Sequence, residues 1–259
     1  MSNRPIRILS NLARAGGTLV SKCVGSMENI VLLSEIHPLG TRKYNPLEQA
    51  AGWYNLLSPG EINNRHVGFV EAIQLIEQHC SEKHKTLIIR DWAHLDFIGV
   101  PFLQNPGYRL QLTEVLSQSF DIIQYGLVRH PIDQWLSTSR LAFIHGRLDI
   151  DAFLTGYRYF AEQCITTGFM RYEDFTREPV PQMQALCIHL SIDFDEQFIT
   201  QWSKNRHVTG DMSNTSKGAL AAEITSLPRR PVDKTLLDRF LDNPDYQRAI
   251  KLLGYTNPE

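Results

Sequence analysis

Cysteine is scarce in this sequence, and the four cysteines present lie far apart. They are Cys23, Cys80, Cys164 and Cys187, so there is no CxxC pair and no cysteine–histidine cluster at zinc spacing. This pattern excludes a disulfide framework or a zinc finger as the basis of the fold. We expect reduced cysteines, most of them in the hydrophobic core.

The sequence also lacks a long hydrophobic run and a strong net charge. No stretch approaches the roughly 20 apolar residues that cross a bilayer, and no apolar segment of signal-peptide length precedes the first predicted strand. The 26 Lys and Arg residues nearly balance the 28 Asp and Glu residues, leaving a formal net charge of −2. We expect a soluble, cytoplasmic protein without a membrane span and without nucleic acid as a partner. An anionic ligand would need a local cluster of basic residues.

No internal repeat, low-complexity tract or linker interrupts the chain, which predicts a single domain over residues 1–259. Short runs rich in Ile, Leu and Val alternate with helical patterns, as is typical of a parallel sheet covered by helices. The predicted strands are Ile6–Ser10, Ile30–Leu33, Thr86–Arg90, Ile122–Val128 and Thr166–Arg171. The predicted fold class is α/β, with three layers (α/β/α) and a central parallel sheet of about five strands.

Helical periodicity of the apolar residues marks segments between and after these strands. The predicted helices are Thr18–Ser26, Val67–Ser81, Ile132–Phe143, Ile150–Gln163, Pro181–Leu190, Asp233–Leu241 and Asp245–Leu253. Three stretches rich in Pro, Gly, Asn and aromatic residues are predicted to be irregular: Glu35–Pro59, Asp91–Tyr108 and Asn205–Pro231. The first two follow strands, and loops at the carboxyl ends of strands build the ligand crevice in such sheets.

The first predicted strand leads into a glycine-containing turn and then a helix, an arrangement that binds anions. The turn reads Arg14-Ala15-Gly16-Gly17-Thr18-Leu19. The glycines let backbone N–H groups approach phosphate oxygens, while Arg14 and Thr18 add a charge and a hydroxyl. The same residues also fit a plain strand–helix turn with a surface arginine. A Walker A loop is excluded, because the GxxxxGK[ST] pattern occurs nowhere in the sequence.

A second feature follows the strand Ile122–Val128. Arg129 stands at the carboxyl end of this strand, and Pro131 suits the first turn of a helix. Ser137 lies eight residues after Arg129, about two helical turns further on. An arginine at a strand end and a helix hydroxyl can bind one phosphate together. Alternatively, Arg129 pairs with a carboxylate and Ser137 faces the solvent.

These features resemble the two phosphate-binding motifs of sulfotransferases that use 3′-phosphoadenosine-5′-phosphosulfate (PAPS). The run from Arg129 to Asp133, together with Ser137, is similar to the family's 3′-phosphate motif, and Ala13–Leu19 is similar to its 5′-phosphosulfate loop. Two later segments of this sequence also resemble segments of the family, in the same order along the chain. They are Arg171–Phe175 with Pro179, and Arg206–Asp211.

The resemblance implies a P-loop NTPase-like fold and a transfer reaction. A sulfuryl group would pass from PAPS to a hydroxyl or amine of a small-molecule or glycan acceptor, with 3′,5′-adenosine bisphosphate as product and no metal. The residues implied to bind PAPS are Arg14, Ala15, Gly16, Gly17, Thr18, Leu19, Arg129, Ser137, Tyr172 and Arg206. The sequence departs from the family at Ala13, Gly17 and Asn205, where a proline, a threonine and a basic residue are usual. The later basic residues Lys217, Arg229 and Arg230 could compensate for the missing charge.

A histidine after the third predicted strand resembles the family's general base. His94-Leu95 follows this strand as the family's His-Leu pair does, and imidazole suits proton transfer near neutral pH. The resemblance makes His94 the base and Arg14 the cation that stabilises the sulfuryl oxygens. From the residues alone, a loop histidine bonded to Asp91 or Asp96 is the simpler interpretation. The two carboxylates are also candidates to orient His94 or to replace it.

Two other functions stay open: an ATP-dependent P-loop kinase acting on a small molecule, and a catalytically inactive nucleotide-binding protein. The missing Walker lysine and the 3′-phosphate motif argue against the kinase. His130, at the variable position of that motif, is expected to be structural. Loop aromatics that could line an acceptor pocket are Trp53, Tyr54, Trp92, Phe97, Phe102 and Tyr108. The sequence identifies neither the acceptor nor the oligomeric state.

Overall fold

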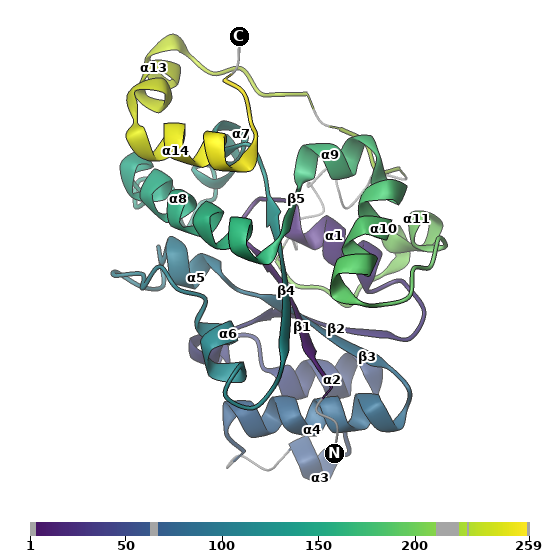
Figure 1. Ribbon diagram of the computed structural model, residues 1–259. Helices are drawn as coiled ribbons and strands as arrows, with labels where there is room; N and C mark the ends of the chain where they lie inside the picture. Colours follow the sequence, from purple (N-terminus) through teal and green to yellow (C-terminus); the bar gives the residue numbers. More distant parts are fainter. Residues whose placement is uncertain (1–3, 63–66, 211–222, 227, 258–259) are drawn as a thin grey trace.

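The computed structural model describes residues 4–62, 67–210, 223–226 and 228–257 (Figure 1). Its centre is a five-stranded parallel sheet with the strand order β2-β3-β1-β4-β5. The strands are β1 (Ile6–Asn11), β2 (Ile30–Ile36), β3 (Thr86–Asp91), β4 (Ile122–Val128) and β5 (Phe169–Arg171). Helices cover both faces of the sheet, so the predicted α/β class with three layers is confirmed.

The helices follow the strands in the alternation that the sequence predicts. They are α1 (Gly17–Val24), η1 (Pro38–Gly40), α2 (Pro46–Tyr54), α3 (Pro59–Ile62), α4 (Phe69–Glu82), α5 (His94–Phe97), α6 (Gln111–Leu116), α7 (Pro131–Thr138), α8 (Ile150–Thr167), α9 (Tyr172–Arg177), α10 (Pro179–Leu190), α11 (Phe198–Gln201), η2 (Trp202–Lys204), α13 (Lys234–Asp242) and α14 (Pro244–Leu253). In Figure 1, α14 lies along α8 in the upper part of the view, and α2 and α4 lie in the lower part, where they pack against β2 and β3.

Side chains that alternate along the strands build a separate core on each face of the sheet. Ile6 and Ile8 of β1 pack with residues of α2, α4 and α6. Leu9, the next residue, packs on the opposite face with residues of α1 and α10, together with Leu32 and Ile88 of the neighbouring strands. Because successive strand side chains point to opposite faces, both faces need apolar residues. The near-continuous apolar strands of the sequence satisfy this need.

Several segments differ from the sequence prediction, among them α5, which lies in a stretch predicted to be irregular, and α6, which was not predicted. Helix α2 lies inside a stretch that we predicted to be irregular. Pro46 occupies its first turn, and the Asn45 side chain caps it by accepting hydrogen bonds from the N–H groups of Leu47 and Glu48. Helix α7 ends at Thr138, earlier than predicted, and α8 continues to Thr167, which shortens β5 to three residues. At α2 the local cap stabilises a helix even though the composition of the stretch is typical of a loop. At α8 the helix ends at Gly168, which has a φ of 81°.

The carboxyl ends of the strands meet at one edge of the sheet and carry the polar residues of interest. Following the sheet order, Glu35 lies at the end of β2, and Arg90 lies at the end of β3. The loop that begins at Leu12 leaves the end of β1, and Arg129 follows β4. The Arg14–Leu19 loop, which we call the phosphate loop after its predicted ligand, therefore lies in the middle of this edge, between Arg129 on one side and Arg90 on the other.

Candidate functional site

The loop between β1 and α1 has the backbone of an anion-binding turn. Arg14 and Gly16 both have positive φ angles, of 67° and 97°, so the chain curls before α1 begins. No side chain among the described residues caps α1, which leaves its first N–H groups and its dipole for an anionic ligand. A Cβ atom at position 16 would overlap the ring of Tyr172. Both the backbone angle and the packing therefore restrict this position to glycine.

The side chains of three other loop residues are occupied in packing. Ala15 is fully buried, and Leu19 packs against the core under α1. Gly17 lies against the Asn11 side chain, where a Cβ atom would clash. These positions can contribute backbone groups to a ligand, whereas Thr18 and Arg14 can contribute side chains.

A cluster of guanidinium groups lies where the phosphate loop meets the end of β4. Arg14 donates a hydrogen bond from Nε to Ser137 Oγ at 3.0 Å, and Arg129 donates to the Arg14 carbonyl at 3.3 Å. Burial lowers the pKa of Arg230, and the neighbouring charges of Arg140, Arg129 and Arg14 lower it further. The structure therefore brings together the three predicted residues Arg14, Arg129 and Ser137, and it adds Arg140 and Arg230.

This cluster has spare hydrogen-bonding capacity. Arg129 Nε is buried and has no hydrogen-bond partner among the described residues. The guanidinium of Arg129 lies over the Tyr172 ring, 4.9 Å from its centroid, so that Tyr172 is held between Arg129 and Gly16. An unsatisfied buried donor is costly, and several cations in one place repel each other. An anion bound here would relieve both costs.

The later basic residues do not all join the cluster. Arg229 pairs with Asp133 at 3.0 Å, and Arg230 donates to the Leu136 carbonyl at 3.1 Å, both on α7. Arg206 is exposed and lies on a different segment. Its neighbour Asn205 donates to the Lys22 carbonyl of α1, and its other neighbour, His207, stacks on Trp53 of α2. Lys217 and Asp211 lie outside the described residues.

Two charged residues that the sequence analysis did not single out lie on the other side of the loop. Arg90 forms an ion pair with Glu35 at 3.0 Å and lies 3.5 Å from the Thr18 hydroxyl. Glu35 sits at a register shift between β2 and β3 and has a φ of 57°, an irregularity that re-aims a side chain. The sequence feature that could have identified these two residues is the presence of a charge at the end of each of two otherwise apolar strands.

A segment from late in the chain crosses this second group. Thr209 accepts hydrogen bonds from Arg90 and Thr18 at its carbonyl and donates from its hydroxyl to Glu35 at 2.7 Å. Gly210, with a φ of 105°, lies against Thr18, Glu35 and Arg90. The Arg206–Gly210 segment therefore contacts the middle of the carboxyl edge through Thr209 and Gly210, whereas the Arg206 side chain is exposed.

His94 begins α5, directly after β3, and is almost fully buried. Its Nε2 lies 2.8 Å from the Val100 carbonyl, so Nε2 carries the proton and Nδ1 carries the lone pair. Nδ1 has no hydrogen-bond partner among the described residues. Burial lowers the pKa of His94, while the Val100 hydrogen bond and the Glu35 charge act in the opposite direction. The ring is therefore a neutral base with an unused lone pair at neutral pH.

The carboxylates near His94 have other partners. Asp96 accepts hydrogen bonds from His37 Nε2 at 3.1 Å and from the Gln111 N–H at 3.0 Å. Asp91 lies 3.4 Å from the Ser10 hydroxyl, and burial, followed by the Asp96 charge, raises its pKa well above the usual value. A carbonyl rather than a carboxylate therefore orients His94.

His37, Asp91 and Asp96 are close enough together for metal binding, and all three are buried. The proton on His37 argues against that use. His37 Nδ1 accepts a hydrogen bond from the Leu39 N–H, so the other ring nitrogen, Nε2, carries the proton and donates to Asp96. A protonated nitrogen has no lone pair for a metal. We interpret the three residues as a buried polar network that fixes the loops after β2 and β3.

The other buried histidine of interest, His130, is structural. Its Nε2 lies 3.2 Å from the Thr256 carbonyl, and its ring packs against Tyr246 and Tyr255. Burial, followed by the nearby Arg229 charge, lowers its pKa to about 4. The imidazole is therefore neutral over most of the pH range and tethers the end of β4 to the C-terminal segment.

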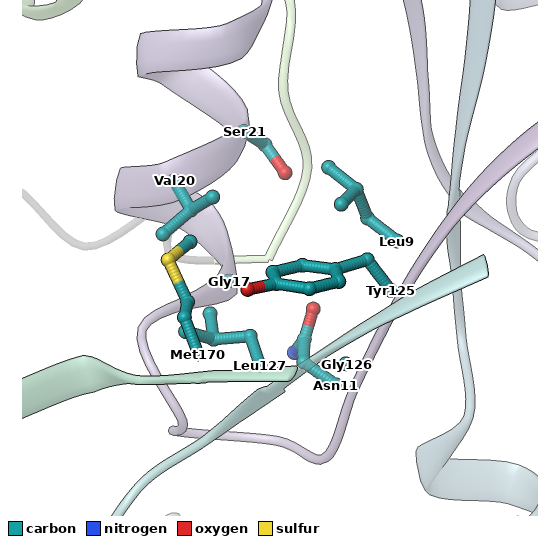
Figure 2. Close-up of a pocket in the computed structure, with 9 residues that line it drawn as sticks. All are labelled: Leu9, Asn11, Gly17, Val20, Ser21, Tyr125, Gly126, Leu127 and Met170. Atoms are coloured by element: carbon teal, nitrogen blue, oxygen red, sulfur yellow. The ribbon is translucent and has the colours of Figure 1, made fainter. Parts of the chain in front are cut away.

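A small pocket lies behind the phosphate loop, between α1 and the strands (Figure 2). Figure 2 shows the Ser21 and Asn11 side chains directed toward the Tyr125 ring at its centre. Its volume of about 10 Å³ has room for one water molecule. The Ser21 hydroxyl, which has no partner among the described residues, would bind such a water. A nucleotide does not fit there and would have to lie across the carboxyl edge.

The fold is that of known sulfotransferase domains. The sulfotransferase domain of the Synechococcus PCC 7002 olefin synthase superposes with a TM-score of 0.67 at 19% identity, covering 99% of this chain and 96% of that one. The sulfotransferase domain of the curacin biosynthetic pathway gives 0.61 at 14% identity, covering 99% and 100%. No family model and no curated protein sequence matches the chain. The fold expected from the sequence resemblance is thus confirmed.

None of the helices in the described part of the chain combines the length and apolar composition that crossing a bilayer requires.

Proposed function

We propose that this protein is a sulfotransferase that moves a sulfuryl group from PAPS to a hydroxyl or amine of an acceptor. The shared fold supports assignment to the sulfotransferases in general. The residues at the carboxyl edge of the sheet support PAPS as the sulfuryl donor. This edge carries the phosphate loop with Thr18 in its middle and the guanidinium cluster beside it. PAPS has negative groups at its 5′ and 3′ ends, and two separate cationic sites suit such a molecule.

The hydrogen bond from Arg14 to Ser137 carries the proposal. It joins the phosphate loop to α7, and the bond from Arg129 to the Arg14 carbonyl joins the loop to the end of β4, so that a ligand anchored on the loop reaches the guanidinium cluster. A nucleotide with phosphates only at the 5′ end would place no anion beside the buried Arg129 Nε, which has no hydrogen-bond partner among the described residues. This arrangement favours a 3′-phosphorylated donor over ATP and therefore favours sulfuryl transfer over the alternative kinase function.

In the proposed reaction, the acceptor oxygen attacks the sulfur atom in line with the bond to the 5′-phosphate. The new O–S bond forms as the S–O bond to the phosphate breaks, and the bridging oxygen leaves with the electron pair. Thr18, Arg90 and the first N–H groups of α1 lie where they would stabilise negative charge on the sulfuryl oxygens and the leaving oxygen. Arg129 and Ser137 would hold the 3′-phosphate, and Arg14, which donates to Ser137, would join them there instead of stabilising the sulfuryl oxygens as the resemblance implies.

The acceptor proton would pass to Nδ1 of His94, whose lone pair is unused. Glu35 is the second candidate, because its carboxylate lies beside Thr18 and Arg90 and is 17% exposed. The ion pair with Arg90 and the hydrogen bond from Thr209 already occupy that carboxylate. We therefore propose that His94 is the base and that Glu35 holds the Arg90 side chain in position.

A ligand comparison tests the proposal. The binding of 3′,5′-adenosine bisphosphate should raise the melting temperature by several degrees at a concentration near 100 times its Kd. ATP with Mg²⁺, and ADP, at the same concentration should shift it much less. A larger shift with ATP and Mg²⁺ would favour the kinase. Bisphosphate binding without turnover of PAPS against a broad acceptor panel would favour the inactive nucleotide-binding protein.

The state of the cysteines supports the cytoplasmic location that the sequence predicts. All four cysteines are buried free thiols. Burial raises the pKa of Cys187 to about 11, which keeps its thiol protonated and unreactive. Such cysteines suit a reducing compartment.

A further inference from the structure

Three aromatic rings surround one ammonium group beside the site. Lys43 Nζ lies 5.1 Å from the Tyr44 ring centroid, 5.1 Å from that of Trp92 and 5.0 Å from that of Phe102. The rings meet edge to face, with centroids 5.1 Å apart for Tyr44–Trp92 and 5.0 Å apart for Trp92–Phe102. We call Tyr44, Trp92 and Phe102 the aromatic cage. The negative faces of aromatic rings attract cations, so this arrangement is a cation-binding site.

The cage lies on the acceptor side of the carboxyl edge. Its rings come from the loops after β2 and β3, on the far side of the phosphate loop from Arg129. Trp92 lies two residues before His94. The pKa of Tyr44 is raised by burial first and then by the negative charge of the nearby Glu35. One wall of the cage therefore lies near the carboxylate that pairs with Arg90.

Lys43 is a replaceable occupant of this cage. Its side chain is exposed, and Phe102, one of the walls, is 44% exposed, so the cage opens to solvent. A cation–π contact at an exposed site is worth only about 0.5–1 kcal/mol, and a desolvated cation gains about twice that. A ligand ammonium that buries itself against the three rings can therefore displace the lysine.

We propose that the aromatic cage selects an acceptor that carries an ammonium group, which takes the place of Lys43 when the acceptor binds. This inference rests on the proposed sulfotransferase function and names the substrate class. The ammonium anchors the acceptor, and a separate hydroxyl on the same molecule is the nucleophile, since an ammonium has no lone pair. That hydroxyl would lie toward Glu35 and Arg90, so the acceptor class is a small amino alcohol or a related hydroxylated quaternary amine.

The test compares choline with 3,3-dimethylbutan-1-ol, which has the same shape without the charge. Calorimetry is done on the full-length protein saturated with 3′,5′-adenosine bisphosphate. We expect choline to bind roughly 10-fold or more tightly than the neutral analogue. Lys43→Met should tighten choline binding severalfold, because it removes the competing ammonium from the cage. The neighbouring exposed cation provides the matched control, Arg42→Met, which should leave choline binding unchanged.

Trp92→Leu should abolish the preference for choline, whereas Trp135→Leu, which changes a tryptophan of α7 that packs on Phe153 outside the cage, should retain it. Equal binding of choline and the neutral analogue by both the wild type and Lys43→Met would overturn the proposal. An absence of choline binding by Lys43→Met would also overturn it. In either case an undiminished affinity for the bisphosphate would leave the donor assignment standing. Failure of the wild type to bind the bisphosphate would instead overturn the proposed function.

Discussion

The two sides of the carboxyl edge differ in the partners of their charged side chains. We call Arg14, Arg129, Ser137, Arg140 and Arg230 the donor half, and Glu35, Lys43, Arg90, Trp92 and His94 the acceptor half. Cations in the donor half contact hydroxyl and carbonyl groups and one another. In the acceptor half the charged groups already have partners, such as the Arg90–Glu35 pair and the caged Lys43.

This difference indicates what each half binds. The clustered guanidinium groups, and the buried Arg129 Nε that has no hydrogen-bond partner among the described residues, favour an anion. Paired charges and aromatic rings, by contrast, do not demand an anion, and they suit a ligand that is neutral or positively charged. The division between donor and acceptor therefore follows from local charge balance, and substitutions on either side should have separable effects.

The largest expected effect comes from the acceptor half. Replacing His94 with Gln should reduce turnover by ~10²–10⁴, the usual worth of a positioned base. Glutamine Nε2 can still donate to the Val100 carbonyl, so the loop should keep its shape while the lone pair of Nδ1 is lost. Bisphosphate affinity should change little. Turnover is measured by PAPS-dependent product formation across a range of pH.

The pH profile separates a base from a structural histidine. Burial lowers the pKa of His94, so the wild-type rate should rise with pH below about 6.5 and level off above it. His94→Gln should lose this rise. If the variant keeps wild-type turnover, the base is elsewhere, and Glu35→Gln becomes the next variant to measure.

A second prediction concerns stability in the donor half. The pKa of His130 falls from 6.5 to about 4 on folding, so its contribution is complete above pH 6.5 and is lost as the pH falls toward 4. The folded protein should lose up to about 3 kcal/mol of unfolding free energy over that interval from this residue. His130→Gln, which keeps a donor for the Thr256 carbonyl, should show a shallower decline in urea unfolding.

The difference between the two proteins is the measured quantity, because other titrating groups contribute equally to both. Parallel stability curves between pH 7 and 4 would show that His130 does not take up its proton on unfolding in this interval.

A third prediction tests the cations directly. Arg129→Ala should weaken binding of 3′,5′-adenosine bisphosphate by about 1.5–3 kcal/mol, the worth of a charge-assisted hydrogen bond. Arg129→Lys should recover part of this loss, because it restores the charge without the planar fork. Calorimetry measures both, with Arg109→Ala, an exposed arginine outside the site, as control. Unchanged affinity in a folded Arg129→Ala protein would remove Arg129 from the donor site.

The donor half was more predictable from sequence than the acceptor half. Arg14 and Ser137 lie in contiguous motifs at fixed positions relative to a strand and a helix, so the sequence alone brings them to one edge. Arg230 and Glu35 reach the site only through tertiary packing. Glu35 depends on a register shift within β2, which apolar periodicity does not reveal.

Helix α2 shows the same limit at the level of secondary structure. Its Pro and Gly content predicted a loop, whereas the Asn45 cap and the position of Pro46 produce a helix. The helix fixes where Lys43 and Tyr44 emerge. The aromatic cage therefore required a structure, although Trp92 and Phe102 were already candidates from the sequence.

The smallest expected effect on bisphosphate affinity concerns Arg206, for which the motif resemblance and the structure lead to different predictions. The resemblance assigns Arg206 to the 3′-phosphate, which implies a loss similar to that of Arg129→Ala. In the structure Arg206 is exposed, and its neighbours contact α1 and α2 rather than the donor half. We therefore expect Arg206→Ala to change bisphosphate affinity less than about twofold, as is usual for an exposed charge. Arg230→Ala, which removes a member of the cluster, should cost more. If Arg206→Ala instead costs as much as Arg129→Ala, the Arg206–Gly210 segment rearranges on binding and brings Arg206 to the donor.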